Sequence, residues 1–445
     1  MLTDLEEEVL SEIRPSAREE NERRAVVERV IHRIRELLSA SGMRDADPLL
    51  VGSVAKGTHL AGADTDIFIL FPVETERERM EQVGLSVGKA ALSRPTLKYA
   101  EHPYVRGFAG RYSVDIVPCF AVTDPMHRKS AVDRTPFQSR FVNEHMKAWQ
   151  KDHVRLLKQF FKGTGTYGAE TKVQGFSGYL CELLILNYGE FKETMSAIAE
   201  WRKGQKVGEI YPETRCSNAS LCIADPVDSE RNVAAALGQE AFGTAVIAAR
   251  EYLKDAGRRF FFPGKRRLPR LSSLESVWSD RGHGLLLFTM SRPDIVEDNL
   301  YPQIRKATRN LSALLERYGF SVCRYVFEAN DKIRILFELN ERQHPSWWIM
   351  EGPECWSGTA SEFIDKHRSK GAVIFQEEGK LYAHEKRPFT EPSALVSVKL
   401  RELSLGADLD LLKDSVELAE DKAVFSRENQ QLIASLLHPS FPWES

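Results

Sequence analysis

The sequence lacks the long apolar runs of a membrane protein. No segment approaches the ~20 consecutive apolar residues that a bilayer-spanning helix needs. The first eight residues (Met-Leu-Thr-Asp-Leu-Glu-Glu-Glu) are acidic and have no apolar core of the kind that a secretion signal carries. We therefore expect neither membrane insertion nor secretion.

A strong excess of either charge is also missing. The chain has 61 Lys plus Arg against 64 Asp plus Glu. This near balance argues against a protein that binds nucleic acid over its whole surface. Any contact with nucleic acid should therefore be made by a local basic patch.

Cysteine is sparse and scattered. The six cysteines are Cys119, Cys181, Cys216, Cys222, Cys323 and Cys355. They show neither the close pairing of a metal site nor the density of a small secreted disulfide framework. We expect reduced thiols and a cytoplasmic location.

The 445 residues are too many for one ordinary core, and a soft prior of about 150 residues per domain predicts roughly three domains. Residues 1–145 form the first and show a mixed α/β pattern. Apolar residues recur at helical spacing from Val26 to Leu38 and stop before Gly42. The elements expected after this helix are strands at 49–51 and 66–71, a helix at 77–92, and strands at 98–100, 104–108 and 112–120.

The pattern is largely helical in the second expected domain, residues 146–257, with helices expected near 154–161, 179–201 and 234–252. A basic, proline-containing stretch at 258–270 suits a linker. The third region, residues 258–445, contains a β-α-β-β pattern followed by short helices. Its elements are expected at 285–288, 296–318, 321–327 and 332–339.

Three aspartates form the most informative pattern. Asp64 and Asp66 open an apolar strand and, being two residues apart, point to the same face. Asp115 lies inside a second apolar strand, where an unpaired acid would be destabilising. If the two strands are neighbours, the three carboxylates meet. Such a set can hold two divalent metal ions ~4 Å apart, as phosphoryl or nucleotidyl transfer requires.

A Gly-Ser turn precedes these acids. Gly52 allows close approach of the backbone to a phosphate, and Ser53 offers hydroxyl and amide donors at the start of a helical turn. Each part also has an ordinary structural explanation, since Gly-Ser is usually a turn and Asp-x-Asp is usually a solvated strand end or a cap. The ordered combination with Asp115 favours a catalytic site.

At these residues the sequence resembles the DNA polymerase β-type nucleotidyltransferase superfamily. From about residue 24 to 340 it resembles, more closely, the archaeal class I CCA-adding enzymes. The segments that carry the closer resemblance are 99–105, 114–119, 130–137, 154–158, 167–170, 175–184, 225–228, 231–234 and 292–299. It implies an α+β multidomain fold: a polymerase β-like head with a mixed sheet, a central helical domain, and C-terminal α/β RNA-binding domains.

The resemblance also implies an activity and a set of ligands. The family completes or repairs the CCA end of tRNA from CTP and ATP, without a template. Asp64, Asp66 and Asp115 would then bind two catalytic Mg²⁺ ions, and Ser53 and Lys56 would contact the triphosphate.

Three further residues are implied to bind the nucleotide. Lys158 and Tyr167 would contact the incoming nucleotide, although spacing alone would suggest a surface lysine and a core tyrosine. Arg231, together with a base of the growing RNA end, would accept cytosine or adenine and reject guanine and uracil. Without the resemblance, the segment from Asp228 would predict a helix start capped by that aspartate.

The sequence departs from the family at two of these positions. Lys56 stands where arginine is frequent, which keeps the charge and loses bidentate phosphate geometry. Gln138 stands where histidine is common after the Thr-Pro-Phe segment. Nucleotide affinity could therefore differ from that of relatives.

The tRNA should be held by backbone charge and shape, because double-helical RNA hides its base edges. The resemblance implies contacts with the 3′ end and the acceptor/TΨC arm, and a homodimer. Candidate RNA-binding residues are Arg305 and Arg309, with the 258–270 stretch and Trp347–Trp348 as further patches. Basic helix faces and paired tryptophans also occur without RNA.

Two alternatives remain open from the sequence. One is a poly(A) polymerase or a small-molecule adenylyltransferase, which would differ in nucleotide choice and product length. The other is an RNA-binding module whose acids are catalytic relics.

Overall fold

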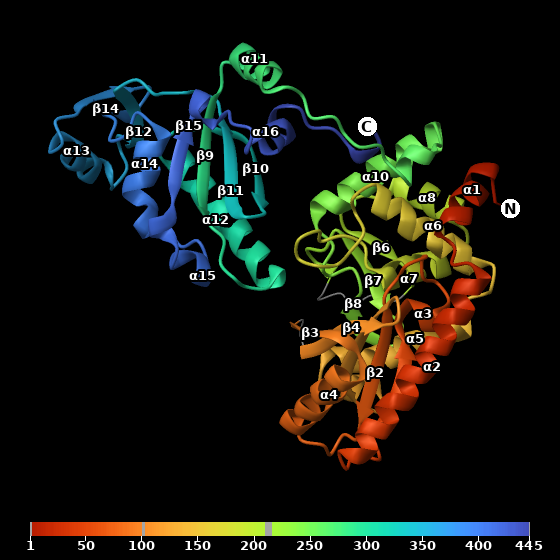
Figure 1. Ribbon diagram of the computed structural model, residues 1–445. Coiled ribbons are helices and arrows are strands. Elements are labelled where there is room, and N and C mark those ends of the chain that lie inside the picture. Colours follow the sequence, from red (N-terminus) through yellow and green to blue (C-terminus); the bar gives the residue numbers. More distant parts are fainter. Residues whose placement is uncertain (1, 100–102, 210–215, 445) are drawn as a thin grey trace. The chain divides into compact units, whose positions relative to one another are not determined.

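The chain divides into two compact units in the computed structural model, which describes residues 2–99, 103–209 and 216–444 (Figure 1). The first unit comprises Met1–Arg266 and Phe441–Ser445, and the second comprises Arg267–Ser440. The division lies within the basic stretch at 258–270.

A five-stranded mixed sheet with the order β1-β2-β5-β4-β3 organises the start of the first unit. Its strands are β1 (Asp47–Val51), β2 (Thr65–Phe71), β3 (Ser93–Tyr99), β4 (Pro103–Ala109) and β5 (Tyr112–Phe120). The β2–β5 pair is parallel and the other pairs are antiparallel. The sequence predicted each strand, although β3 starts earlier than expected and the predicted Ala100 lies outside the described residues.

Helices α2 (Ala17–Ala40) and α4 (Arg77–Ala91) pack on one face of this sheet in a single hydrophobic cluster. Glycine allows α4 to come close to the sheet. A Cβ on Gly84 would lie 2.6 Å from the Pro118 Cβ, and one on Gly88 would lie 2.9 Å from the Val105 Cβ. Both helices were predicted from their apolar periodicity.

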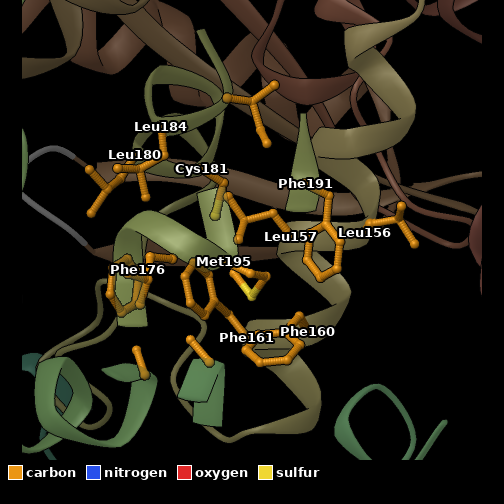
Figure 2. Packing of buried hydrophobic residues seen from close by; sticks show 14 of the residues in the cluster. Leu156, Leu157, Phe160, Phe161, Phe176, Leu180, Cys181, Leu184, Phe191 and Met195 are labelled. Atoms are coloured by element: carbon orange, nitrogen blue, oxygen red, sulfur yellow. The ribbon is translucent and has the colours of Figure 1, made fainter. Parts of the chain in front are cut away.

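The rest of the first unit surrounds a core rich in aromatic residues. Its main helices are α6 (Gln150–Gly163), α7 (Gly178–Tyr188), α8 (Phe191–Glu200) and α10 (Gln239–Lys254). Figure 2 shows Phe160, Phe161 and Phe176 within this core, and the last two rings stack at 4.0 Å. The helix α1 (Asp4–Ile13) and Trp443 belong to the same cluster.

A small sheet in this region was not predicted. It consists of β6 (Gln205–Val207), β7 (Leu221–Asp225) and β8 (Asp228–Asn232). The prediction of a capped helix start at Asp228 is therefore wrong, because this segment pairs with β7 and α10 begins later, at Gln239. Between the two elements, Val233, Ala234 and Leu237 lie in the core without forming a helix.

The second unit contains the predicted β-α-β-β arrangement. Strands β9 (Gly284–Ser291), β10 (Val322–Ala329) and β11 (Lys332–Leu339) form a sheet with β15 (Glu417–Glu420), and α12 (Glu297–Arg317) packs on it. Helices α11 (Leu271–Arg281), α14 (Pro392–Lys399) and α16 (Gln430–Leu437) complete its cores.

Short helices end the chain as expected, but strands that the sequence did not predict also follow β11. Strands β12 (Trp347–Glu354), β13 (Val373–Glu377) and β14 (Lys380–Lys386) form a three-stranded sheet against α13 (Ala360–Arg368). One face of this sheet carries exposed side chains such as Trp347, Ile349 and Val373. Apolar residues on an exposed face blur the alternation by which a half-buried strand is recognised.

Two cysteines differ from the expectation of reduced thiols. Cys216 and Cys222 form a disulfide with their Cα atoms 5.5 Å apart, because the chain turns directly before β7. The other four cysteines are unpaired. No helix within the described residues is long and apolar enough to cross a bilayer.

Candidate active site

The three aspartates converge at one end of the β2–β5 strand pair. The parallel register places Asp66 beside Asp115, and Asp64 directly precedes β2. Asp115 is buried, whereas the Asp64 side chain is 44% exposed. The pairing of the two apolar strands thus brings Asp115 to Asp64 and Asp66, although it follows Asp66 by 49 positions in the sequence.

Arg106 on β4 is the cation of this acidic cluster. Its Nε and Nη2 atoms each donate to Asp115 at 2.7 Å, and Nη2 also lies 3.1 Å from Asp64 Oδ2. Sequence reasoning missed this residue. The sequence feature that could have revealed it is the Gly110–Arg111 turn, because a hairpin with this turn pairs Arg106 with Asp115.

The environment of Asp66 favours the protonated form of its carboxyl. Burial raises the pKa of its carboxyl to about 7, and the negative charges of Asp115 and Asp64 add to the effect. Such crowding of like charges is the environment in which a divalent cation replaces a proton. The described residues contain no preformed group of three acid, histidine or cysteine ligands, and Arg106 holds two of the aspartates. Carboxylate oxygens supplemented by substrate phosphates still match the preference of Mg²⁺.

The Gly-Ser turn lies directly against this cluster. Gly52 has a φ of +71°, and a Cβ at this position would lie 2.1 Å from Asp66 Oδ2. Its backbone N–H donates to Ser139 Oγ at 3.3 Å, and the short helix α3 (Gly52–Lys56) begins at this residue. Glycine is therefore required here both for its backbone conformation and for the space that the carboxylate occupies.

Lys56 and Lys158 meet at a buried carboxylate. Lys56 Nζ lies 2.5 Å from Glu182 Oε2, and Lys158 Nζ lies 3.1 Å from Glu182 Oε1. The Thr58 hydroxyl also donates to Glu182. Burial alone would raise the Glu182 pKa, but the two ammonium groups lower it to about 2. Burial lowers the pKa of Lys158, while Glu182 opposes that shift.

Sequence reasoning missed Glu182 as well. A lone acid in the apolar run of α7 was the signal, by the same argument that identified Asp115. Spacing alone suggested a surface position for Lys158, yet its side chain is only 2% exposed.

Tyr167 lies next to this buried group. Its backbone forms an isolated bridge with Phe176, and its hydroxyl would lie 3.1 Å from a Cβ on Gly178. The Lys162 ammonium lies 5.4 Å from the Tyr167 ring centroid. Burial raises the pKa of Tyr167, which keeps the hydroxyl protonated.

Arg231 on β8 lines a pocket of about 630 Å³. Its Nη1 atom lies 2.9 Å from Asp225 Oδ2, which also accepts a hydrogen bond from Gln138. Two further arginines of the pocket, Arg128 and Arg134, pair with buried Asp228 at 3.0 and 2.9 Å. The pocket therefore carries three guanidinium groups fixed by two buried acids.

The two candidate RNA-binding arginines belong to the second unit. Arg305 and Arg309 lie on α12, where Arg309 is exposed and Arg305 is half-buried.

A parallel strand pair that carries three aspartates beside a Gly-Ser turn defines a nucleotidyltransferase, and the family model described as "Nucleotidyltransferase domain" matches residues 27–138. The models "tRNA nucleotidyltransferase, second domain" and "CCA-adding enzyme, C-terminal domain" match residues 152–262 and 281–421.

Curated relatives match almost the whole chain. The CCA-adding enzyme of Thermoplasma volcanium is 35% identical over 94% of both chains, and that of Methanosarcina acetivorans is 36% identical over 95% of this chain and 94% of its own. The Archaeoglobus fulgidus enzyme is 38% identical over 77% of this chain and 78% of its own. The chain belongs to the family of CCA-adding enzymes, which are tRNA nucleotidyltransferases.

Among solved structures, the Cid1 poly(U) polymerase with bound MgATP or MgGTP is similar at 15% and 16% identity. The TM-scores are 0.47 and 0.45, over 58% of this chain and 97% of the other. These values are too low to support an argument about this chain.

Proposed function

We propose that this chain adds the nucleotides C, C and A, one at a time, to the 3′ end of tRNA. CTP would be used twice and ATP once, with release of pyrophosphate at each step. The observation that carries the proposal is the meeting of Asp64, Asp66 and Asp115 beside Gly52 in a chain whose relatives are CCA-adding enzymes over nearly their full length.

The three aspartates are the residues that would hold two Mg²⁺ ions. Bound there, the ions would lower the pKa of the attacking 3′ hydroxyl and stabilise charge on the departing pyrophosphate. Support comes from the raised pKa of Asp66, to which burial contributes most and the negative charges of Asp115 and Asp64 contribute next. Arg106 would have to release at least part of its hold on Asp64 and Asp115.

Ser53, Lys56, Lys158 and Tyr167 would bind the nucleotide. Lys56 and Lys158 share the single negative charge of Glu182, so the buried group carries a net charge of about +1 when all three are ionised. A net positive charge suits the triphosphate, a strong polyanion. Glu182 would keep both ammonium groups in place before the nucleotide arrives.

Arg231 would read the base of the incoming nucleotide together with the growing RNA end. The ring nitrogen N3 of cytosine and N1 of adenine accept hydrogen bonds, whereas the equivalent atoms of uracil and guanine carry a proton. An arginine donor aimed at this position therefore favours C and A. The position of Arg231 in the wall of a 630 Å³ pocket supports this role.

The second unit would hold the acceptor/TΨC arm of the tRNA, with Arg305 and Arg309 contacting phosphates. The proposal also includes a homodimer and a cytoplasmic location.

The first test is to incubate the purified protein with Mg²⁺ and a tRNA that lacks its CCA end. CTP alone should add two cytidines, and the adenosine should appear only when ATP is also present, on a gel that resolves single nucleotides. A long adenosine tail would instead assign a poly(A) polymerase. Binding of tRNA without any extension would favour a binding module.

A further inference from the structure

The carboxylate of Asp225, at the end of β7, is fully engaged by four donors. Oδ1 accepts from the Tyr179 hydroxyl at 2.9 Å and from the Val227 backbone N–H at 3.2 Å. Oδ2 accepts from Gln138 Nε2 at 2.6 Å and from Arg231 Nη1 at 2.9 Å. Asp225 is 1% exposed, so water contributes little to this arrangement.

Gln138 and Arg231 thus share one oxygen although they come from different elements. Gln138 lies on α5 (Thr135–His145), and Arg231 lies on β8. A carboxylate oxygen offers two lone-pair directions in the plane of the carboxylate group. The amide that occupies one of them therefore confines the guanidinium to the other. Because the guanidinium is a rigid planar fork, fixing one N–H direction restricts the orientation of its remaining donors.

The orientation of those donors matters because Arg231 is 33% exposed and lines the pocket. A donor aimed at an acceptor nitrogen favours C and A over U and G, and a tilted donor loses this advantage. The amide of Gln138 already donates to Asp225, so its effect on the base passes through that acid.

We propose that Gln138 is a specificity-determining positioning residue, which orients Arg231 through the shared Asp225 oxygen. This inference rests on the proposed role of Arg231 in base selection. Sites built to hydrogen-bond one partner reject an analogue through the orientation of their polar groups, so discrimination should depend on Gln138 more strongly than catalysis does.

The test compares Gln138→Leu, which removes the donor, with Gln138→His, whose ring N–H can replace it. Glu144→Gln, an exposed position on the same helix, is the matched control. For each protein the ratio of kcat/KM for CTP over UTP is measured on tRNA lacking CCA, and the ratio for ATP over GTP on tRNA ending in CC.

The Leu variant should lower both ratios by about threefold to tenfold, the range expected for loss of one hydrogen bond. The change should come mainly from faster use of UTP and GTP. The His variant should recover at least part of the discrimination, and Glu144→Gln should match the wild type.

Three results would overturn the inference. The first is a Gln138→Leu variant whose ratios are unchanged, measured beside an Arg231→Gln variant that loses selectivity. This result would overturn the inference and leave the proposed function standing. An equal fall in kcat/KM for all four nucleotides would assign Gln138 a purely structural role. A wild-type protein that adds no cytidine would overturn both the inference and the proposed function.

Discussion

Asp66 and Glu182 are both carboxylates of the first unit that burial penalises, yet their environments shift their pKa values in opposite directions. Burial and two neighbouring aspartates raise the pKa of Asp66 to about 7. Glu182 is also penalised by burial, but Lys56 and Lys158 lower its pKa to about 2. Burial alone therefore does not decide the charge of an acid; the neighbouring charges do.

The difference separates two tasks. Asp66 lies in a cluster with excess negative charge, which a divalent cation would complete. Glu182 lies in a cluster where its single negative charge is outweighed by two ammonium groups, which leaves a net charge of about +1. The first cluster is suited to binding a cation, and the second is suited to binding an anion.

Asp66→Asn should produce the largest effect. Incorporation should fall by about a thousandfold or more because one of the three residues that would hold the metal ions is lost. Stability of the metal-free protein should not fall, since the change removes one of three like charges at nearly constant volume. Single-turnover extension and thermal unfolding in EDTA measure the two effects. Normal turnover would refute the assignment of Asp66 as a metal ligand.

Glu182→Gln should be the most destabilising substitution, by about 3–5 kcal/mol, because it leaves two buried ammonium groups without a counter-ion. Denaturant unfolding followed by tryptophan fluorescence measures the change. In the double variant Glu182→Gln/Lys158→Met one of those charges is also removed, so part of the stability should return. Equal stability of Glu182→Gln and the wild type would show that the two ammonium groups do not need Glu182 as their counter-ion.

Gly52→Ala should have an intermediate effect, costing about 1–3 kcal/mol of stability, because its φ is +71° and its Cβ would meet Asp66 Oδ2. Displacement of the carboxylate should also lower incorporation. Gly62→Ala is the control, since it has a similar φ of +74° and no atom within 4 Å of its Cβ. A Gly62 variant as inactive as the Gly52 variant would contradict a specific role for the contact with Asp66.

Stability in EDTA should also depend on pH. The folded-state pKa of Asp66 is raised from 3.8 to about 7, so the folded protein binds more protons than the unfolded chain in this window, and stability should fall as the pH rises through it. Glu182, lowered from 4.5 to about 2, should contribute stability that is present above pH 4.5 and is lost as the pH falls toward 2.

Asp66→Asn should remove the fall in stability between pH 3.8 and about 7 and leave the loss of stability below pH 4.5. Unfolding temperatures collected between about pH 4 and 8 measure the first of these changes. A pH profile that is unchanged by the substitution would assign the fall in stability to another group.

The sequence was most informative where the chain is fully buried. Strands β2 and β5 are continuous apolar runs, so each acid within them stood out. Strand β8 contains Ser229, Glu230 and Arg231, a polar segment whose strand conformation comes from pairing with β7 and could not be read locally. The half-exposed strands β12 to β14 were missed for a related reason.

The residues of the candidate site also divide into those that the sequence predicted and those that it did not. Its acids and its Gly-Ser turn follow from residue type and spacing. The acids that pair with the lysines and arginines of the site are Glu182, Asp225 and Asp228. Their pairings join residues up to 126 positions apart in the sequence. No periodicity in a single sequence specifies such pairings.

The packing of Trp443 has a consequence for synthesis on the ribosome. Its indole stacks on Phe260 at 5.6 Å and donates to Glu251, both in the first unit, although all 174 residues of the second unit lie between them and Trp443 in the sequence. The face of Phe260 under this indole therefore stays uncovered until residues 441–443 have been synthesised and have emerged from the ribosome. A nascent chain interrupted before Phe441 would present this aromatic surface to chaperones and proteases.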